Sequence, residues 1–557
     1  MEKKKLMIFI LVFSSILTHL PAQQPSSDTN KIYIMGTNLP PEDLEKIIAA
    51  LPSAAQVKPL KPRRLLIFDL NVNYGGHRSA AYANVAFKLM GEKTGAYETV
   101  ISHDKNIFKR ESITQFDALF FNNNVGNLFE DRDLRENIVE FVYKGGGLLG
   151  VHGTSVAFTK WPGAIEDWEE FGIMLGARGA NHRESTEPIV VKIEDPSNPL
   201  TSLFESNYFQ YRDEFFRFHQ VYSRERVRVL LSIDTNRTEY SQDKKYGNTV
   251  RPDNDYAIAW IRNYGKGRVF YSTIAHNPYV FYDPLILKFY LNAVQFALGD
   301  LKSSTIPSAR LNSRNLAFEK LGWKVGIIGQ SADSSIEEIC QLARTNDLLF
   351  SGIAYGERIY NRSDTTFDIN TSQKDTEQYR LMSDKYGVRM IICRLDSLPE
   401  SEEKSRDLFE FLDKMGVETV VIPAFENVNN KLKEFCLKTG VNIALDFSNQ
   451  IETKTVNSTI KRYGNIAIPF LTIDRNSFKT LNRRIESLSC SSIGLIIDDS
   501  IADNPSAIES LLNALFKKKL SETVIMIKYD SKNSDKFSKI ILQIEKTAIK
   551  LSDRKDL

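Results

Sequence analysis

The second half of the chain repeats one pattern eight times: a short apolar run followed by a stretch with helical spacing. The apolar runs begin near Lys324, Leu348, Arg389, Glu418, Val441, Ile466, Ser492 and Glu522. Helical stretches lie between them, for example at 405–415 and 431–437. Apolar strands that alternate with helices are typical of a parallel sheet that helices cover. Eight such units in about 240 residues predict a (β/α)8 barrel.

The first half also alternates strands and helices, but it ends differently. We predict strands at 65–69, 118–121 and 148–151, with helices at 79–91 and 134–143. These strands are apolar throughout, which indicates a parallel sheet covered on both faces. The pattern then changes to a hairpin, 257–260 and 269–272, followed by a helix at 284–298. The fold class is therefore α/β, a flavodoxin-like parallel-sheet domain followed by a TIM barrel.

Histidine and cysteine divide the chain into two domains. Six His lie between residues 77 and 276, and all four Cys lie after residue 330. This partition predicts a first domain at 63–301 and a barrel at 318–557, joined by a linker at 302–317. Residues 23–62 form a leader with one predicted helix at 42–50. The Cys have no paired spacing, so we expect buried apolar residues rather than a zinc module.

The N-terminus has the order of a secretory signal peptide. It starts with Met1-Glu-Lys-Lys-Lys5, continues with an apolar run from Leu6 to Leu17 and reaches Pro21-Ala22. The run is shorter than the roughly 20 residues that span a bilayer, and an uncleaved anchor is the alternative interpretation. We predict that residues 1–22 are a signal peptide and that the protein is periplasmic or secreted.

The balance of charge argues against one class of partner. Lys and Arg number 72 against 70 Asp and Glu, so the net charge of +2 gives no electrostatic basis for nucleic-acid binding. No segment after the signal peptide is apolar enough to cross a membrane. We expect a small-molecule partner, and no motif specifies the oligomeric state.

Polar side chains gather where the predicted strands of the first half end. In chain order they are Tyr74, His77, His152, His182, Asp213, Glu214 and His276. Ligands of a parallel sheet bind at the carboxyl ends of its strands. His is the side chain best suited to proton transfer near neutral pH, and it is a common metal ligand. Any one His has a structural alternative as a hydrogen-bonded core residue, but four on one rim indicate a functional site.

Four motifs resemble the trehalose-utilisation (ThuA-like) family over about 64–301. They are Gly145-Gly-Gly-Leu-Leu-Gly-Val-His152, His77-Arg-Ser79, Asp213-Glu214 and Tyr264-Gly-Lys-Gly-Arg-Val-Phe-Tyr271 followed by His276. The family is similar in fold to class I glutamine amidotransferases whose nucleophilic Cys is lost, and His152 takes the place of that Cys here. The resemblance implies a site lined by His77, His152, His182, Glu214 and His276, and a link to disaccharides and their 3-keto derivatives.

The second half resembles the xylose-isomerase-like barrels of sugar phosphate isomerases and epimerases over about 321–551. The resemblance rests on Leu321-Gly-Trp-Lys-Val-Gly-Ile-Ile328 and Met415-Gly-Val-Glu-Thr-Val-Val-Ile422. Such barrels bind a metal through carboxylates and at least one His, and this half has no His. Its strand ends carry Glu426, Asp446, Asp474 and Asp498-Asp499, which either hold a cation or cap helices. We interpret the barrel as degenerate, a sugar-binding or structural partner.

The leading functional hypothesis is an exported carbohydrate-processing protein that acts on a disaccharide or 3-keto-glycoside without a nucleophilic Cys. His152 and His276 would transfer protons and Glu214 would orient one of them, as catalytic residues. Tyr74, His77, His182 and Asp213 would bind substrate. The reaction type, whether hydrolase, lyase or isomerase, and any cofactor stay open. The alternatives are a non-catalytic carbohydrate-binding protein and a metallohydrolase that uses the His as ligands, which no HExxH spacing supports.

The signal-peptide hypothesis makes the first testable prediction. The exported protein should begin near Gln23, because cleavage follows the small residue at the end of the apolar segment. N-terminal sequencing of the protein recovered from the periplasm or medium measures this. A mature protein that still begins at Met1 would contradict it.

Overall fold

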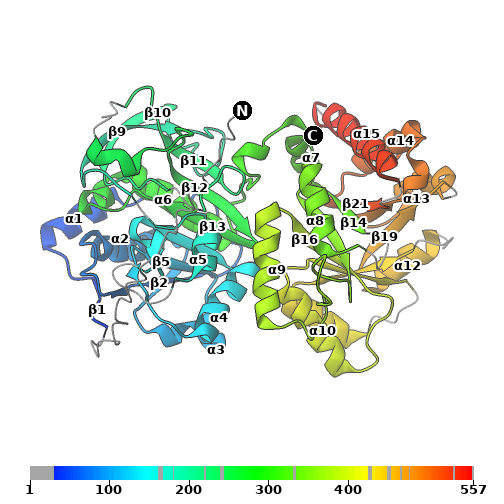
Figure 1. The fold of residues 1–557 in the computed structure, drawn as a ribbon, viewed down its shortest axis with the longest axis horizontal. Helices are drawn as coiled ribbons and strands as arrows, with labels where there is room; N and C mark the ends of the chain where they lie inside the picture. Colours follow the sequence, from blue (N-terminus) through cyan, green and yellow to red (C-terminus); the bar gives the residue numbers. More distant parts are fainter. Residues whose placement is uncertain are drawn as a thin grey trace, which may run out of the picture.

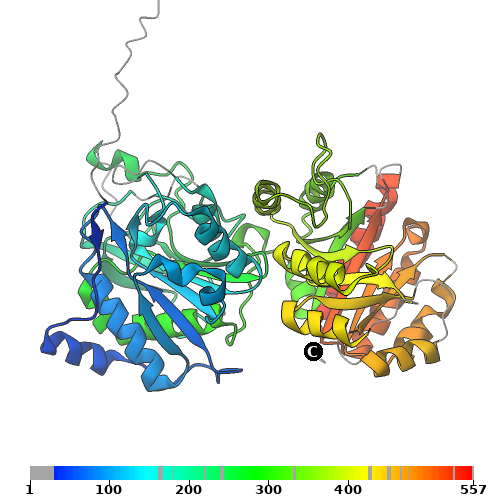
Figure 2. The same cartoon turned by 90° about the horizontal axis from the view of Figure 1, so that it is seen from below.

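The computed structural model of this 557-residue chain describes residues 30–160, 167–179, 181–218, 221–238, 244–329, 334–424, 429–447, 453–463, 467–475, 477–530 and 533–554. The predicted signal peptide lies outside these residues. Two lobes lie side by side, a sheet domain and a barrel, as seen in two perpendicular views (Figures 1 and 2). The α/β fold class predicted from the sequence is confirmed.

The N-terminal domain is built on a nine-stranded mixed sheet in the order β10-β9-β11-β12-β13-β7-β5-β2-β4. In chain order these strands are β2 (Arg64–Phe68), β4 (Glu98–Ser102), β5 (Ala118–Asn122), β7 (Gly147–Val151), β9 (Glu187–Ile193), β10 (Tyr208–Asp213), β11 (Arg228–Ile233), β12 (Ala257–Tyr264) and β13 (Gly267–Ser272). The five from β13 to β4 are parallel, and β9 to β12 pair antiparallel. The predicted apolar strands and the β12–β13 hairpin are both present.

Helices cover both faces of this sheet, which explains why its central strands are apolar at every position. Alternate side chains point to opposite faces, so Leu65 and Ile67 pack in one core cluster and Leu66 and Phe68 in the other. The first cluster is closed by α1 (Pro41–Ala50), α2 (Ser79–Thr94) and α6 (Pro284–Leu298). The second is closed by η1 (Lys105–Phe108), α3 (Arg110–Ile113), α4 (Arg132–Tyr143) and α5 (Glu169–Leu175).

Short elements complete the domain. They are β1 (Ile32–Tyr33), β3 (Asn71–Val72), β6 (Val125–Gly126), η2 (His152–Ser155), β8 (Val156–Ala157), η3 (Lys244–Thr249) and η4 (Pro278–Tyr282). The leader packs on the domain, because β1 pairs with β3 and the backbone N–H groups of Gln56 and Val57 donate to the Gln295 side chain at 2.8 and 3.2 Å.

The second domain is a closed barrel of eight parallel strands. The strands are β14 (Trp323–Gly329), β15 (Phe350–Ala354), β16 (Arg389–Arg394), β17 (Thr419–Pro423), β18 (Asn442–Asp446), β19 (Ala467–Ile473), β20 (Ser492–Ile497) and β21 (Glu522–Tyr529). The helices and one 3-10 turn between and after them are α8 (Ile336–Thr345), α9 (Gln373–Tyr386), α10 (Glu402–Lys414), α11 (Asn430–Thr439), α12 (Thr453–Tyr463), α13 (Phe478–Ser487), η7 (Asp499–Ile501), α14 (Pro505–Lys518) and α15 (Ser534–Ser552). The eight predicted strand–helix units are therefore confirmed.

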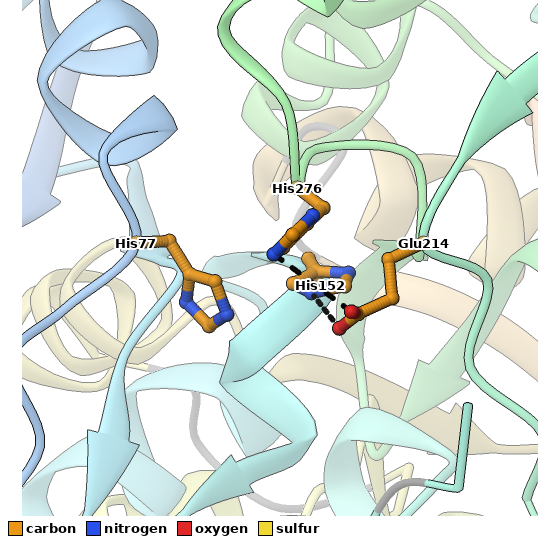
Figure 3. A group of neighbouring side chains, drawn as sticks. All are labelled: His77, His152, Glu214 and His276. Carbon is orange, nitrogen blue, oxygen red and sulfur yellow. Dashed lines mark ion pairs between the residues drawn. The ribbon is translucent and has the colours of Figure 1, made fainter. Parts of the chain in front are cut away.

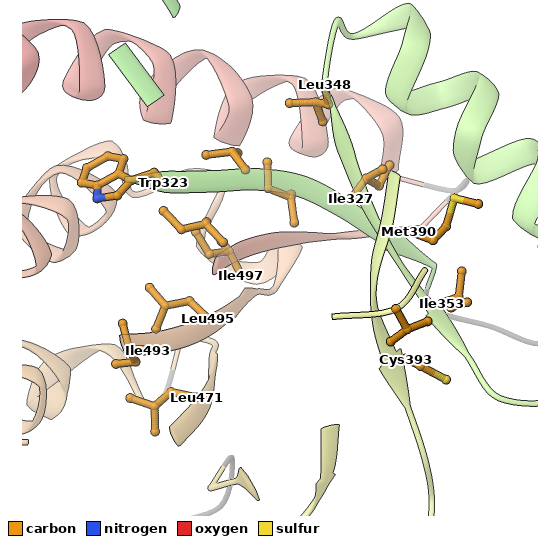
Figure 4. Packing of buried hydrophobic residues seen from close by; sticks show 14 of the residues in the cluster. Trp323, Ile327, Leu348, Ile353, Met390, Cys393, Leu471, Ile493, Leu495 and Ile497 are labelled. Carbon is orange, nitrogen blue, oxygen red and sulfur yellow. The ribbon is translucent and has the colours of Figure 1, made fainter. Parts of the chain in front are cut away.

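Apolar side chains fill both layers of the barrel. A large cluster lies between the strands and the outer helices, and Figure 4 shows part of it around Trp323, Ile327 and Leu495. A smaller cluster, which includes Ile328, Phe470 and Met526, alternates with it along the strands and fills the interior. All four Cys are free; Cys340, Cys393 and Cys436 are buried in the outer cluster, as expected of small apolar residues.

The predicted linker is tied to the barrel. It contains η5 (Ser308–Arg310) and most of α7 (Ser313–Lys320), and α7 packs against α15. The buried guanidinium of Arg310 donates to the carbonyls of Gly387 at 2.7 Å and Leu348 at 2.9 Å. The barrel wall therefore begins inside the segment that the sequence predicted as linker.

A buried arginine joins the two domains. Arg380 of α9 has no exposed surface, and its guanidinium donates to Glu170 of α5 at 2.7 Å and to Glu136 of α4 at 2.9 Å. Tyr264 also donates to Glu170, at 2.7 Å. Nearby, Asp384 of α9 accepts from Arg226 at 2.8 Å and from Arg262. Figure 1 shows α9 at this boundary, beside α5.

The domains meet at the amino ends of their strands. A cavity of about 360 Å³ between them is lined by Trp323, Phe350, Arg389 and Glu522, each at the start of a barrel strand, and by Tyr264 of the β12–β13 turn. Lys266, in the same turn, forms an ion pair with Asp413 of α10. The Gly-Lys-Gly motif that the sequence singled out therefore contacts the barrel. The carboxyl ends, where ligands bind in both folds, lie at the opposite ends of these strands.

Arg380 provides the second prediction. Arg380→Ala should lower the free energy of unfolding by about 3–5 kcal/mol, because it leaves the buried Glu170 without its cation. In differential scanning calorimetry, the variant should also unfold in two separate transitions, one for each domain, because the cluster no longer couples the domains. The matched control is Arg406→Ala, since Arg406 is exposed and its ion pairs are with Glu403 and Asp407 of its own helix α10. A single unchanged transition for Arg380→Ala would show that this cluster does not couple the domains.

Candidate functional site

Four side chains from separate parts of the N-terminal domain converge at one edge of its sheet. His77 lies in the loop before α2, His152 follows β7, Glu214 follows β10 and His276 follows β13. Each offers one nitrogen or oxygen atom, and these four atoms lie within 4.8 Å of one another. Figure 3 shows His152 and His276 turned toward the Glu214 carboxylate, with His77 facing them from the α2 side.

The three imidazole rings surround a common point. The ring centroids of His77 and His152 are 4.9 Å apart, those of His77 and His276 5.2 Å, and those of His152 and His276 5.1 Å. Glu214 Oε1 lies 3.3 Å from His152 Nε2, and Glu214 Oε2 lies 3.8 Å from His276 Nε2. The carboxylate therefore faces two imidazoles at once.

The backbone holds His152 in an uncommon conformation. Its φ of 41° lies in the left-handed region, which costs a non-glycine residue free energy. The Tyr271 hydroxyl donates to the His152 carbonyl at 2.7 Å, and His152 Nδ1–H donates to the Thr273 carbonyl at 3.0 Å. These bonds turn Nε2 toward Glu214. Backbone strain held by surrounding contacts is a common feature of functional sites.

Burial favours the neutral form of two rings. Burial lowers the pKa of His152, although the neighbouring Glu214 carboxylate opposes this shift. Burial, followed by repulsion from His152 and His276, lowers the pKa of His77 well below its usual value. Neutral imidazoles can accept a proton or coordinate a metal ion.

Asp213 lies beneath the cluster rather than within it. It is fully buried and accepts hydrogen bonds from the backbone N–H groups of His276 and Asn277, both at 3.1 Å, and from the Asn277 side chain at 2.7 Å. Burial raises the pKa of Asp213 to about 7, and these hydrogen bonds offset part of the shift. In this position Asp213 holds the loop that carries His276 against the segment that carries Glu214.

The sequence analysis missed Asn123, which ties three of the site segments together. Its side-chain oxygen accepts from the Gly153 N–H at 2.8 Å, and its amide donates to the Ala275 carbonyl and to Ser79 Oγ, both at 3.1 Å. Gly153, Ala275 and Ser79 are close neighbours in sequence of His152, His276 and His77. The sequence does contain a signal that could have identified Asn123, because three consecutive Asn at 122–124 end a buried apolar strand.

The remaining predicted residues lie around the four. The Tyr74 hydroxyl is 3.3 Å from His77 Nε2, and the half-buried Tyr74 ring packs against that imidazole. His182 is exposed on the outer side, with Nδ1 3.2 Å from Glu214 Oε2. Trp168 is partly buried and packs with Phe158 and Phe171 against the core cluster, away from the four.

Two of the four described barrel carboxylates cap backbone N–H groups, and the other two lie near cationic side chains. Asp498 is the N-cap of η7 and accepts from the Ser500 N–H at 3.0 Å, and Asp474 accepts from the Ser477 N–H at 2.7 Å. Asp499 pairs with Lys536 at 3.7 Å, and Asp446 lies 4.0 Å from Arg394. Glu426 lies outside the described residues. Of the two roles that the sequence left open, the structure shows capping for Asp474 and Asp498.

Comparison with known proteins supports the assignment of the first domain. The family model for ThuA, trehalose utilisation, matches residues 64–297. This match supports a carbohydrate-related role at the level of the family. No curated protein matches the chain. No helix of the described residues is long and apolar enough to cross a membrane.

Solved structures resemble each half separately. A ThuA-like protein from Bacteroides uniformis is 18% identical, with 46% of this chain and 96% of that chain covered and a TM-score of 0.34. A xylose isomerase domain protein from Planctomyces limnophilus is 9% identical, with 40% and 97% covered and a TM-score of 0.28. A xylose isomerase-like TIM barrel protein from Mycobacterium smegmatis, in complex with magnesium, is 8% identical, with 42% and 98% covered and a TM-score of 0.29.

Asn123 provides the third prediction. Asn123→Ala should lower the free energy of unfolding by about 3 kcal/mol, because three hydrogen bonds of about 1 kcal/mol each are lost. Urea denaturation measures this change. Asn106→Ala is the control, since the exposed Asn106 side chain donates to its near neighbour Asp104 at 2.8 Å, and its loss should change stability by less than about 0.5 kcal/mol. Equal stability of the two variants would contradict the role of Asn123.

Proposed function

We propose that the N-terminal domain processes a carbohydrate at the site formed by His77, His152, Glu214 and His276. The observation that carries the proposal is the convergence of these four side chains at the carboxyl edge of the sheet. The family match over residues 64–297 supports a carbohydrate as the substrate class. A disaccharide or a 3-keto-glycoside is the substrate that we propose.

The chemistry of the four groups suits such a substrate. Sugars offer hydroxyl groups and, in keto derivatives, a carbonyl whose neighbouring C–H protons are acidic. Imidazole and carboxylate groups can take a proton from one such position and return it to another, which is general acid–base catalysis. Thiolate catalysis is excluded in this domain, since all four Cys lie after residue 330. The Tyr74 ring beside His77 offers a surface on which an apolar sugar face can stack.

We propose that the barrel supports this domain as a structural or sugar-binding partner. Its interior is filled by apolar side chains, and Asp474 and Asp498 cap helices or turns. The domains also join through the amino ends of their strands, so each carboxyl edge is available to its own ligand. We further propose export to the periplasm or medium, which rests on the N-terminal signal pattern and the sequencing test given above.

The fourth prediction tests catalysis. Turnover should be measured on a panel of disaccharides and their 3-keto forms. His152→Ala and His276→Ala should each lower kcat/KM by roughly 10²–10⁴-fold, as expected on removal of a general acid or base. The double variant should lose much less than the product of the two factors, because residues that act as a unit are not additive.

His103→Ala is the matched control, since His103 is exposed at the end of β4, outside the cluster. Circular dichroism and thermal melting establish that each variant is folded. Sugar binding without turnover, weakened in the two site variants, would replace catalysis with the alternative of a carbohydrate-binding protein. Unchanged turnover and unchanged sugar affinity in folded His152→Ala and His276→Ala would contradict both functions.

A further inference from the structure

The cluster contains an electrostatic conflict between two of its members. Because His152 Nδ1–H donates to the Thr273 carbonyl, a neutral His152 presents the lone pair of Nε2 to the cluster. That lone pair lies 3.3 Å from Glu214 Oε1, which carries lone pairs of its own. His152 is fully buried, and its Nε2 has no hydrogen-bond partner among the described residues. Two electron-rich atoms at this distance in a buried site need a cation or a proton between them.

We propose that His77, His152, Glu214 and His276 bind a divalent transition-metal ion. The proposal concerns the site assigned above to carbohydrate; catalytic use of the ion rests on that proposed function, whereas binding of the ion does not. The ion would accept the orphaned lone pair of His152 and neutralise the carboxylate of Glu214.

The distances fit such an ion. An ion about 2.05 Å from both His152 Nε2 and Glu214 Oε1 would subtend an angle of about 107° between them, close to the tetrahedral value. Two ligands of a tetrahedral ion lie about 3.3 Å apart, so separations of up to 4.8 Å in the cluster require the most distant pair to close by about 1.5 Å. The similar spacing of the three rings places all three imidazoles around the same point.

The donor set selects the class of metal. Three imidazole nitrogens and one carboxylate oxygen suit zinc, iron, cobalt or nickel, whereas magnesium and calcium prefer oxygen ligands. The Thr273 carbonyl fixes the tautomer of His152, which is the usual outer-sphere arrangement of a metal-bound His. His276 retains 22% of its side-chain exposure, so a substrate oxygen could approach from that side only as a fifth ligand.

The spacing explains why these residues match no zinc-binding sequence motif. Its ligands come from four loops that are separated by 62 to 75 residues, as the positions 77, 152, 214 and 276 show. Zinc motifs such as HExxH place two ligands on one helix, and that signature requires ligands close in sequence. Here the sheet alone brings the ligands together.

The fifth prediction measures metal directly. Full-length protein should be purified without chelator from medium supplemented with zinc, iron, cobalt, nickel and manganese. Elemental analysis should find about one equivalent of a transition metal per chain, as expected for a site of four ligands. Glu214→Gln, which keeps the shape of the side chain, and His276→Ala should lose most of this metal. His103→Ala should keep it.

A second measurement covers variants that fail to fold. Wild-type protein stripped with chelator should be titrated with Co²⁺ and followed by its visible absorbance, which reports nitrogen and oxygen ligands. Saturable bands that Zn²⁺ displaces support the site. Wild-type protein that lacks metal and shows no saturable Co²⁺ or Zn²⁺ binding overturns it, as does metal retained equally in folded Glu214→Gln and His276→Ala.

The metal site and the proposed function can be overturned independently of each other. Bound metal that depends on the four ligands, in a protein without turnover or sugar binding, would overturn the proposed function and leave the metal site intact. Turnover that persists in protein shown to be free of metal, and shown not to bind it, would overturn the metal site and leave the function intact.

Discussion

The carboxylate of Glu214 is the group around which the N-terminal domain is arranged. A buried carboxylate is unfavourable unless cations or hydrogen-bond donors compensate it. Three imidazole nitrogens surround it, with His152 Nε2 at 3.3 Å, His182 Nδ1 at 3.2 Å and His276 Nε2 at 3.8 Å, but a neutral His152 turns a lone pair toward the carboxylate and does not compensate its charge. Asp213 and Asn123 fix the loops that carry these rings. A ready-made polar centre therefore exists at the carboxyl edge before any ligand arrives.

The contact between the domains leaves that edge free. The buried Arg380 and its partners Glu136 and Glu170 close the interface on the side of α4, α5 and α9. The β12–β13 turn touches the barrel, whereas His276 follows the far end of β13. Strand β13 thus runs from the domain interface to the site. Ion pairs of this kind contribute little to stability on a protein surface. Because these are buried, removing one partner lowers the free energy of unfolding substantially.

The barrel fold is held by packing rather than by the polar side chains at its rim. Its interior and outer clusters are both apolar, so packing alone accounts for the eight closed strands. The carboxylates at two of its strand ends satisfy nearby backbone N–H groups as caps. Closure of the barrel depends on strand pairing and side-chain volume, whereas chemistry at its rim depends on a few side chains that packing does not require.

The sequence by itself determined the central parallel strands of the first domain, the eight strand–helix units of the barrel and the order of the two folds. Apolar runs such as 118–121 and 420–422 are continuous because both faces of a parallel strand are buried, and that signal is local. It also pointed to His152 and His276, because both follow an apolar strand. The sequence did not point to Asn123 or Arg380, because these residues act through contacts with residues 30 and 210 positions away in the chain. The family resemblance had placed His77, His152, His182, Glu214 and His276 in one site. Only the tertiary structure decided which four of them come closest and which atoms face one another, because the strand order of the sheet, and not distance along the chain, sets which loops meet.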